Sequence, residues 1–222
     1  MDIKKKLLDK GFVFIPKWQP STKIDSLAEQ LGNVIKISDY EDHSGIPDVQ
    51  KIIPKQRSKS LKNQYSGKFG LDSFPLHTDL AHWSKPPNYL MLRCIRGFEQ
   101  VSTKVLPLKY ILPQITELGF ARSVVKPKNN ERAVRGCLLP LSFQNNNQKC
   151  IRWDSLFLEA ANDKAELIQK FILKDEVWDM AINIRLVHQG DTLIINNHSH
   201  LHARSSIPND CVKRELERIY FN

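Results

Sequence analysis

The sequence has few cysteines, and the four present are far apart: Cys94, Cys137, Cys150 and Cys211. No Cys-x-x-Cys pair occurs, which argues against a zinc ribbon and against a redox dithiol motif. We therefore expect free thiols and a reducing, cytoplasmic environment.

Long apolar runs are also missing, so the sequence predicts neither a membrane span nor a secretory signal. It shows no repeats, no low-complexity tract, no zinc-finger spacing and no RNP-like aromatic motif. The net charge of +9 favours anionic partners in general. Without a recognition motif, nucleic acid is the minor alternative among those partners. The sequence does not indicate an oligomeric state.

The remaining composition is that of a globular protein. The chain has 222 residues, of which 41% are hydrophobic and 26% charged, and we expect a single domain spanning residues 1–222. Periodicity predicts helices at residues 2–10, 22–31, 107–118 and 160–179. Short apolar segments predict strands at residues 11–15, 34–37, 49–53, 89–95, 102–106, 122–126, 135–139, 192–195 and 216–221. Many short strands with few helices indicate a mainly β (α+β) sandwich or barrel with flanking helices.

His77 and Asp79 form a His-x-Asp pair where the apolar segment Phe74-Pro75-Leu76 gives way to polar residues. On one strand, residues two apart point to the same face, so the two side chains could act together. A basic, glycine-containing segment, residues 55–73, precedes them and is placed to cover or line a pocket. The pair alone is a weak signal, because such tripeptides arise often by chance.

A second group of histidines, His198, His200 and His202, lies near the other end of the chain. Alternation places all three on one face of a strand. They could form their own metal site, be a pH-responsive patch, or contribute one metal ligand while the others lie around it. A single histidine from this group would complete a two-His-one-carboxylate triad with His77 and Asp79. Such a triad holds Fe(II) and leaves three coordination positions free.

Arg214 and Arg218 are four residues apart and share one face of the last expected strand. A guanidinium binds a carboxylate through paired charge-assisted hydrogen bonds, so an inward-facing arginine would suit a dicarboxylate. The alternative is a pair of surface arginines that pair with Glu215 or Glu217.

Together these segments resemble the taurine dioxygenase / clavaminate synthase-like family of Fe(II)- and 2-oxoglutarate-dependent oxygenases. The resemblance covers roughly residues 60–110 and 188–221. It is carried by Gln64 to Asp79, by Pro86-Pro87-x-Tyr89-Leu90-x-Leu92-x-Cys94, by residues 190–197, and by His202-Ala203-Arg204. It implies a double-stranded β-helix (jelly roll) core. The departures are His198 after Asn197, Ala203 in place of glycine, and a short central insert.

The resemblance also implies roles for single residues. It makes His77, Asp79 and His202 the iron ligands, and it selects His202 from the histidine group. Thr103 and Arg214 become the residues that bind 2-oxoglutarate. Arg218 becomes a substrate contact, as does Arg152 in Arg152-Trp153-Asp154, for which a structural ion pair at a strand end is the alternative.

The implied activity is oxidation of a small molecule with Fe(II), O2 and 2-oxoglutarate, releasing succinate and CO2. Halogenating relatives lack the carboxylate at the position of Asp79, so its presence favours hydroxylation or another C–H oxidation. An anionic or zwitterionic substrate, by analogy an amino acid or amino-acid-derived metabolite, is expected. Two alternatives remain open. One is a non-catalytic jelly-roll protein that binds an anionic ligand or nucleic acid; the other is a zinc hydrolase, which lacks an obvious general base.

Overall fold

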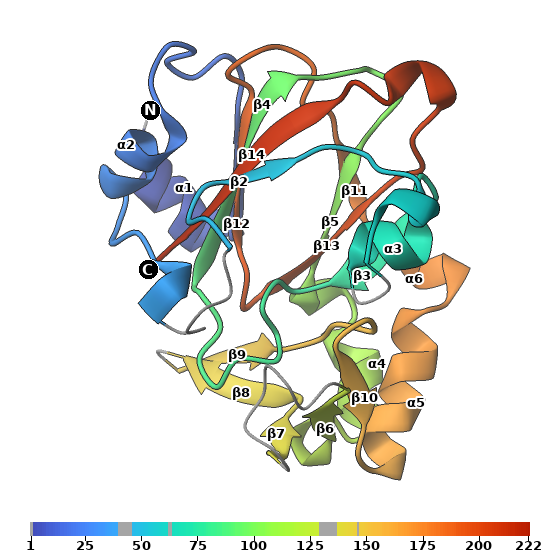
Figure 1. Cartoon of the computed structure of the whole chain (residues 1–222). Coiled ribbons are helices and arrows are strands. Elements are labelled where there is room, and N and C mark those ends of the chain that lie inside the picture. The colour runs from blue at the N-terminus through green and yellow to red at the C-terminus, as the bar shows by residue number, and fades with distance from the viewer. Residues whose placement is uncertain (1, 40–45, 62–63, 129–136, 146) are drawn as a thin grey trace.

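The structure is a computed structural model that describes residues 2–39, 46–61, 64–128, 137–145 and 147–222. Two antiparallel sheets form its centre (Figure 1), with strand orders β1-β12-β4-β14-β2 and β11-β5-β13-β3. The strands of the larger sheet are β1 (Phe12–Ile15), β12 (Thr192–Asn196), β4 (Tyr89–Arg96), β14 (Glu215–Phe221) and β2 (Gln50–Ile52). Those of the smaller sheet are β11 (Ile182–Ile184), β5 (Thr103–Pro107), β13 (His200–Arg204) and β3 (Phe74–His77).

Strands from the beginning and the end of the chain are neighbours in both sheets. In the larger sheet β1 pairs with β12, and in the smaller sheet β3 pairs with β13. This antiparallel, non-consecutive order is that of a double-stranded β-helix, or jelly roll, as expected from the sequence. Its consequence for the site is that residues near 77 lie beside residues near 202.

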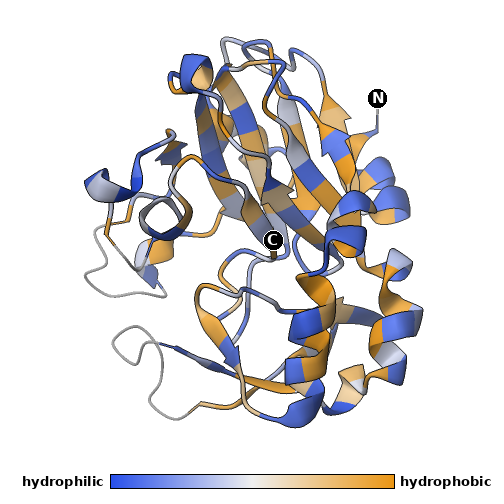
Figure 2. Cartoon of the chain, turned by 90° about the vertical axis from the view of Figure 1, so that its right-hand side faces the viewer, coloured by the Kyte–Doolittle hydropathy of each residue, from blue (hydrophilic) through white to orange (hydrophobic). Residues whose placement is uncertain are grey.

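Side chains on the central strands alternate between two apolar clusters. Leu193 and Ile195 point between the sheets, where they pack with Val105 of the smaller sheet. Ile194 and Met91 point outward instead, to the cluster that includes Leu27 of α2. Both faces of the larger sheet are thus covered, and Figure 2 shows hydrophobic and hydrophilic residues mixed along its strands.

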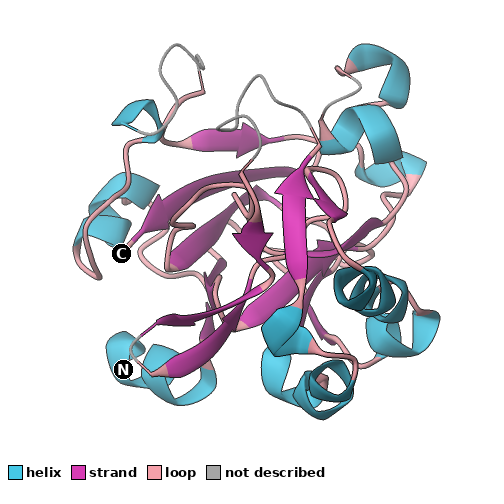
Figure 3. Cartoon of the chain, turned by 90° about the horizontal axis from the view of Figure 1, so that it is seen from below, coloured by secondary structure: helices cyan, strands magenta, loops and turns pink. Residues whose placement is uncertain are grey.

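Helices surround the sheets when the molecule is seen from below (Figure 3). The outer face of the larger sheet is covered by α1 (Ile3–Lys10) and α2 (Ile24–Glu29). The outer face of the smaller sheet packs against a second group of elements. These are α4 (Leu112–Glu117), α5 (Asp163–Ile172), α6 (Asp175–Asp179), and the sheet of β10 (Leu158–Ala160), β6 (Val124–Pro127) and β7 (Leu139–Pro140). The hairpin of β8 (Ser142–Asn145) and β9 (Gln148–Ile151), and the short helix α3 (Tyr65–Phe69), complete the elements used below.

Most strands expected from apolar segments are confirmed, but residues 34–37 do not form one. Only an isolated bridge joins Val34 to Phe221, and a 3-10 turn begins at Ile37. The Asp48 carboxylate accepts a hydrogen bond from the Ile37 amide (2.8 Å), which holds the turn. The Ile37 amide therefore donates to the Asp48 side chain and not to the backbone of a neighbouring strand.

One further expectation about local structure is wrong in part. The single helix predicted for residues 160–179 is divided into α5 and α6, and Ala160 belongs to β10. The Asn162 side chain accepts from the Ala165 amide and so fixes where α5 begins. The glycine-containing segment before His77 includes the short helix α3, which Gly70 ends with a φ of 58°. The strand expected at 135–139 falls partly outside the described residues, and β7 begins at Leu139.

Candidate metal centre

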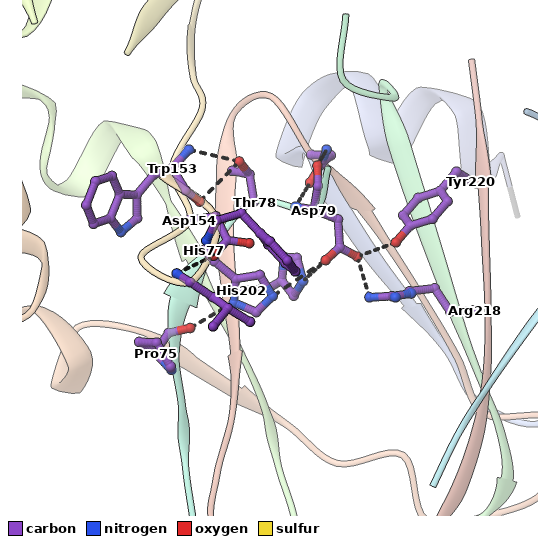
Figure 4. A network of polar contacts seen from close by, with 12 residues as sticks. Pro75, His77, Thr78, Asp79, Trp153, Asp154, His202, Arg218 and Tyr220 are labelled. Carbon is purple, nitrogen blue, oxygen red and sulfur yellow. Dashed lines mark hydrogen bonds and ion pairs between the residues drawn. The ribbon is translucent and has the colours of Figure 1, made fainter. Parts of the chain in front are cut away.

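Three buried side chains converge at one end of the smaller sheet. The Nε2 atoms of His77 and His202 lie 3.5 and 3.6 Å from Asp79 Oδ1 (Figure 4). Each of the three residues has a potential ligand atom that lies within 4.8 Å of those of the other two. Two imidazole nitrogens and one carboxylate oxygen on one side of an open space are the donor set of a facial triad.

Strand pairing brings the two histidines together. His77 is the last residue of β3, and its partner in the antiparallel register with β13 is His202. The His77 Nδ1 atom lies 2.8 Å from the Pro75 carbonyl oxygen, so a proton there would be donated to that carbonyl. That arrangement leaves Nε2 with a free lone pair directed at the site.

Asp79 is not on the same strand as His77, contrary to the expectation. The strand ends because Thr78 forms bonds with Trp153: the Thr78 amide donates to the Trp153 carbonyl (2.7 Å), and the Trp153 amide donates to Thr78 Oγ1 (3.0 Å). The chain then turns, with Leu80 at a φ of 53°. The Asp79 carboxylate reaches the histidines from this turn, and not through alternation along a strand.

The Asn197 side chain holds the Asp79 backbone in place. Its Oδ1 accepts from the Asp79 amide (2.8 Å), and its Nδ2 donates to the Asp79 carbonyl (2.9 Å) and to the Pro87 carbonyl (3.1 Å). Asn197 is fully buried. This pair of bonds fixes the turn that presents the carboxylate.

Replacing Asn197 with alanine is expected to lower the free energy of unfolding by about 2–4 kcal/mol, because buried backbone groups of Asp79 and Pro87 lose their partners. Urea unfolding monitored by circular dichroism measures the change. Asn209→Ala, in an exposed turn, is the control and should have little effect. Equal stability of the two variants would contradict a role for Asn197 in holding the turn.

The second carboxylate oxygen of Asp79 is occupied by protein donors. Oδ2 accepts from Arg218 Nη1 (2.9 Å) and from the Tyr220 hydroxyl (3.0 Å), both on β14 (Figure 4). Burial alone would raise the pKa of Asp79, but the Arg218 guanidinium holds that pKa well below its usual range. Burial lowers the pKa of His202 to about 4, so its imidazole is neutral, the form that binds metals.

The three donors open into a cavity of about 490 Å³. Besides the triad it is lined by residues of β2, α3, β5, β14 and the segment around residue 154. Its charged lining beyond the triad consists of one acid and five cations: Asp154, Lys51, Lys55, Arg204, Arg214 and Arg218. A small molecule bound beside the triad would therefore meet both signs of charge, with positive charge in excess.

The two residues expected to bind a dicarboxylate, Thr103 and Arg214, both line this cavity. Arg214 is 2% exposed, and its Nε and Nη2 atoms are buried without a hydrogen-bond partner among the described residues. Burial lowers the pKa of Arg214 to about 10, which still leaves it charged at neutral pH. A buried guanidinium without a partner is costly, so the site is suited to receive an anion.

Asp154 and Tyr65 were not selected from the sequence, although both line the cavity. The Tyr65 ring lies over the His77 ring, with centroids 4.6 Å apart. The Asp154 carboxylate accepts from the Leu156 amide (2.7 Å) and lies beside the Tyr65 hydroxyl. Burial raises the pKa of Asp154. The sequence analysis names Asp154 only as part of Arg152-Trp153-Asp154, in which the expected substrate contact is Arg152, and the position of the Asp154 side chain at the cavity depends on the fold.

Arg152, expected to contact substrate, does not line the cavity. Its guanidinium donates to the carbonyl oxygens of Ala81 (3.2 Å), Trp83 (2.6 Å) and Ser84 (3.2 Å). It thus holds the loop that follows Asp79. The structural alternative is the better description of Arg152, although its partners are carbonyl groups and not an acid.

The other two histidines of the cluster lie away from the triad. His198 precedes β13, and its ring nitrogens lie 3.1 Å from Asn145 Nδ2 and 3.0 Å from the Pro86 carbonyl. The His200 ring packs on Gly11, where an added Cβ atom would come within 2.0 Å of it. Burial lowers the pKa of His200 to about 4. Of the three alternatives, a single metal ligand from the cluster fits this arrangement.

No protein-family model matches the sequence, and no curated protein matches it. Known structures do match. The chain is similar to an asparagine oxygenase in complex with Fe(II), 3-hydroxyasparagine and succinate, with a TM-score of 0.73 and 17% identity over 99% of this chain and 77% of that one. It is also similar to the PvcB protein from Pseudomonas aeruginosa, with a TM-score of 0.70 and 14% identity over 99% and 78% of the two chains.

A third similar structure is the non-heme iron oxygenase OrfP in complex with Fe and alpha-ketoglutaric acid. Its TM-score is 0.67 at 21% identity, over 99% of this chain and 77% of that chain. At such identities the likeness concerns the fold, and the chain has the jelly-roll fold of these proteins. Among the described residues, no helix is both long and apolar enough to cross a membrane.

Proposed function

We propose that this chain is an Fe(II)- and 2-oxoglutarate-dependent oxygenase that hydroxylates a small amino acid or a related metabolite, in the taurine dioxygenase / clavaminate synthase-like branch of these enzymes. One observation carries the proposal. A buried two-His-one-carboxylate set lines the same cavity as the buried guanidinium of Arg214, whose Nε and Nη2 atoms have no hydrogen-bond partner within the described part of the chain. The first would hold the metal and the second the cosubstrate.

The donor set suits a ferrous ion. Two imidazoles and one carboxylate, here those of His77, His202 and Asp79, are the ligands of non-heme iron sites with open positions. When bound, the iron supplies the activation of O2 that no side chain can supply. The protein's part is to hold the ligands, to orient the substrate and to keep bulk water out, and all three donors are about 95% buried.

The 2-oxoglutarate would be held by Arg214 and Thr103. Arg214 can pair through two parallel N–H groups with the carboxylate distant from the metal. Thr103, on β5 beside β13, is buried and lines the same cavity. OrfP, one of the similar structures, is in complex with alpha-ketoglutaric acid. Arg214 immediately precedes β14 and Arg218 lies on it, and both side chains line the cavity.

The charges in the cavity favour a zwitterionic substrate. Asp154 could receive an ammonium group, and the cations Lys51 and Lys55 could receive a carboxylate, since all three line the cavity. The similar structures contain 3-hydroxyasparagine in the asparagine oxygenase and (3S)-hydroxy-L-Arg in OrfP. An amino acid is therefore the first substrate class to test.

The test is release of labelled succinate from 2-oxoglutarate across a panel of amino acids under air with Fe(II). We expect at least one amino acid to raise succinate release above the uncoupled rate, with a hydroxylated product. A non-catalytic protein would give no succinate with any of them and would bind anions with a steep salt dependence. Metal analysis of protein purified without air distinguishes iron from zinc.

A further inference from the structure

Arg218 makes a direct contact with one of the three potential metal ligands. Its Nη1 donates to Asp79 Oδ2 (2.9 Å), while its Nε and Nη2 donate to Gln50 Oε1 (3.2 and 2.6 Å). Arg218 and Gln50 are cross-strand partners in the register of β14 with β2. The guanidinium is therefore held from one side by a strand and from the other by the carboxylate of the triad.

Tyr220, two residues further on β14, meets the same oxygen. Its hydroxyl donates to Asp79 Oδ2 (3.0 Å), and its ring is 1% exposed. A carboxylate oxygen has two lone pairs, and two donors use both. The other oxygen, Oδ1, faces His77 and His202. The two oxygens of one carboxylate are thus divided between the metal side and the protein side.

We propose that Arg218 and Tyr220 are positioning residues that confine Asp79 to ligation through Oδ1 alone. This inference rests on the proposed function, because it concerns the same metal ion. It replaces the substrate contact that the family resemblance implies for Arg218 with a role in holding the metal ligand. Since Tyr220 shares that role, the proposal names a residue to which the sequence gave no function.

Confinement of Asp79 to one oxygen matters because it determines how many coordination positions of the metal ion stay open. A carboxylate that is free to rotate can bind a metal ion through both oxygens and so occupy two positions. The two histidines and a chelating 2-oxoglutarate would then fill the remaining four of an octahedral ion, and none would be left for O2. Two donors on Oδ2 prevent that rotation. Groups that orient ligands in this way commonly change metal affinity or activity by 10–100-fold when they are removed.

Two variants that conserve charge test the proposal, so that electrostatics cannot mimic the result. Tyr220→Phe removes one hydroxyl, and Arg218→Lys keeps the positive charge but loses the planar fork. Tyr89→Phe, on the adjacent strand β4, is the matched control for loss of a phenol. We measure the Fe(II) dissociation constant without air, 2-oxoglutarate or substrate, and the visible spectrum of the Co(II) protein, which reports coordination number.

We expect Tyr220→Phe and Arg218→Lys to weaken Fe(II) binding by about 10–100-fold and to change the Co(II) spectrum, while Tyr89→Phe matches the wild type. Unchanged Fe(II) binding and spectra would overturn the proposal. A raised KM in Arg218→Lys for the amino acid that raises succinate release would then return Arg218 to substrate binding. Should Arg218→Lys fail to fold, Tyr220→Phe decides alone. A wild type that binds no Fe(II) would instead refute the proposed function itself.

Discussion

His202→Ala is expected to remove ferrous iron from the protein and to lower succinate release by more than about 100-fold. Loss of a ligand should exceed the 10–100-fold effect typical of the groups that merely orient ligands. His202 supplies the only donor that β13 directs at Asp79 among the described residues, and its Nε2 lies 3.6 Å from Asp79 Oδ1. Iron content after anaerobic loading and gel filtration, together with succinate release, measures the effect.

His188→Ala is the control for that experiment, because His188 is exposed and its hydrogen bonds with Asp191 use its backbone: the amide donates to Asp191 Oδ2 and the carbonyl accepts from the Asp191 amide. It should keep both iron and activity. Thermal unfolding without metal checks that the His202 variant is folded. Full iron content in a folded His202→Ala protein would mean that the metal, if any, binds elsewhere.

Arg214→Met is expected to raise the 2-oxoglutarate concentration needed for half-maximal activity by about 30-fold or more while iron is retained. Truncating one partner of a buried, hydrogen-bonded charge pair costs roughly 2–5 kcal/mol. The same change should raise the melting temperature of the protein without ligand, since it removes a buried charge whose Nε and Nη2 atoms have no hydrogen-bond partner among the residues described. Added 2-oxoglutarate should then stabilise the wild type much more than the variant.

The control is Arg185→Met, which removes an exposed guanidinium that donates to the Glu99 carbonyl. Titration of 2-oxoglutarate in the succinate assay and in thermal unfolding covers both parts of the prediction. Loss of iron from Arg214→Met, with unchanged 2-oxoglutarate dependence, would assign Arg214 to the metal and not to the cosubstrate.

The sequence could predict the triad because each of its two parts is recognisable from neighbouring residues alone. His77 and Asp79 are two residues apart, and the apolar segment before each part predicts a strand. Physics alone could not choose among the three histidines of the cluster. The choice of His202 came from the family resemblance, and the register that places it opposite His77 agrees with it.

The contacts that support the triad could not be predicted, because they join residues far apart in sequence. Tyr220 reaches Asp79 across 141 positions and Asn197 across 118. Asp154 lies beside Tyr65 at the cavity, although the two are far apart in sequence. The same reason explains two wrong expectations, that Asp79 shares the strand of His77 and that residues 34–37 form a strand. The group that bonds to the chain where β3 ends belongs to Trp153, and the group that holds the turn at Ile37 belongs to Asp48.

The most direct test of the iron and 2-oxoglutarate site is the visible absorption of the anaerobic protein after both have been added. The proposed geometry predicts a weak charge-transfer band in the wild type, produced by 2-oxoglutarate chelating a ferrous ion held by His77, Asp79 and His202. The band should be absent from His77→Ala. Absence of the band from wild-type protein saturated with both, or an unchanged band in the variant, would contradict the assignment.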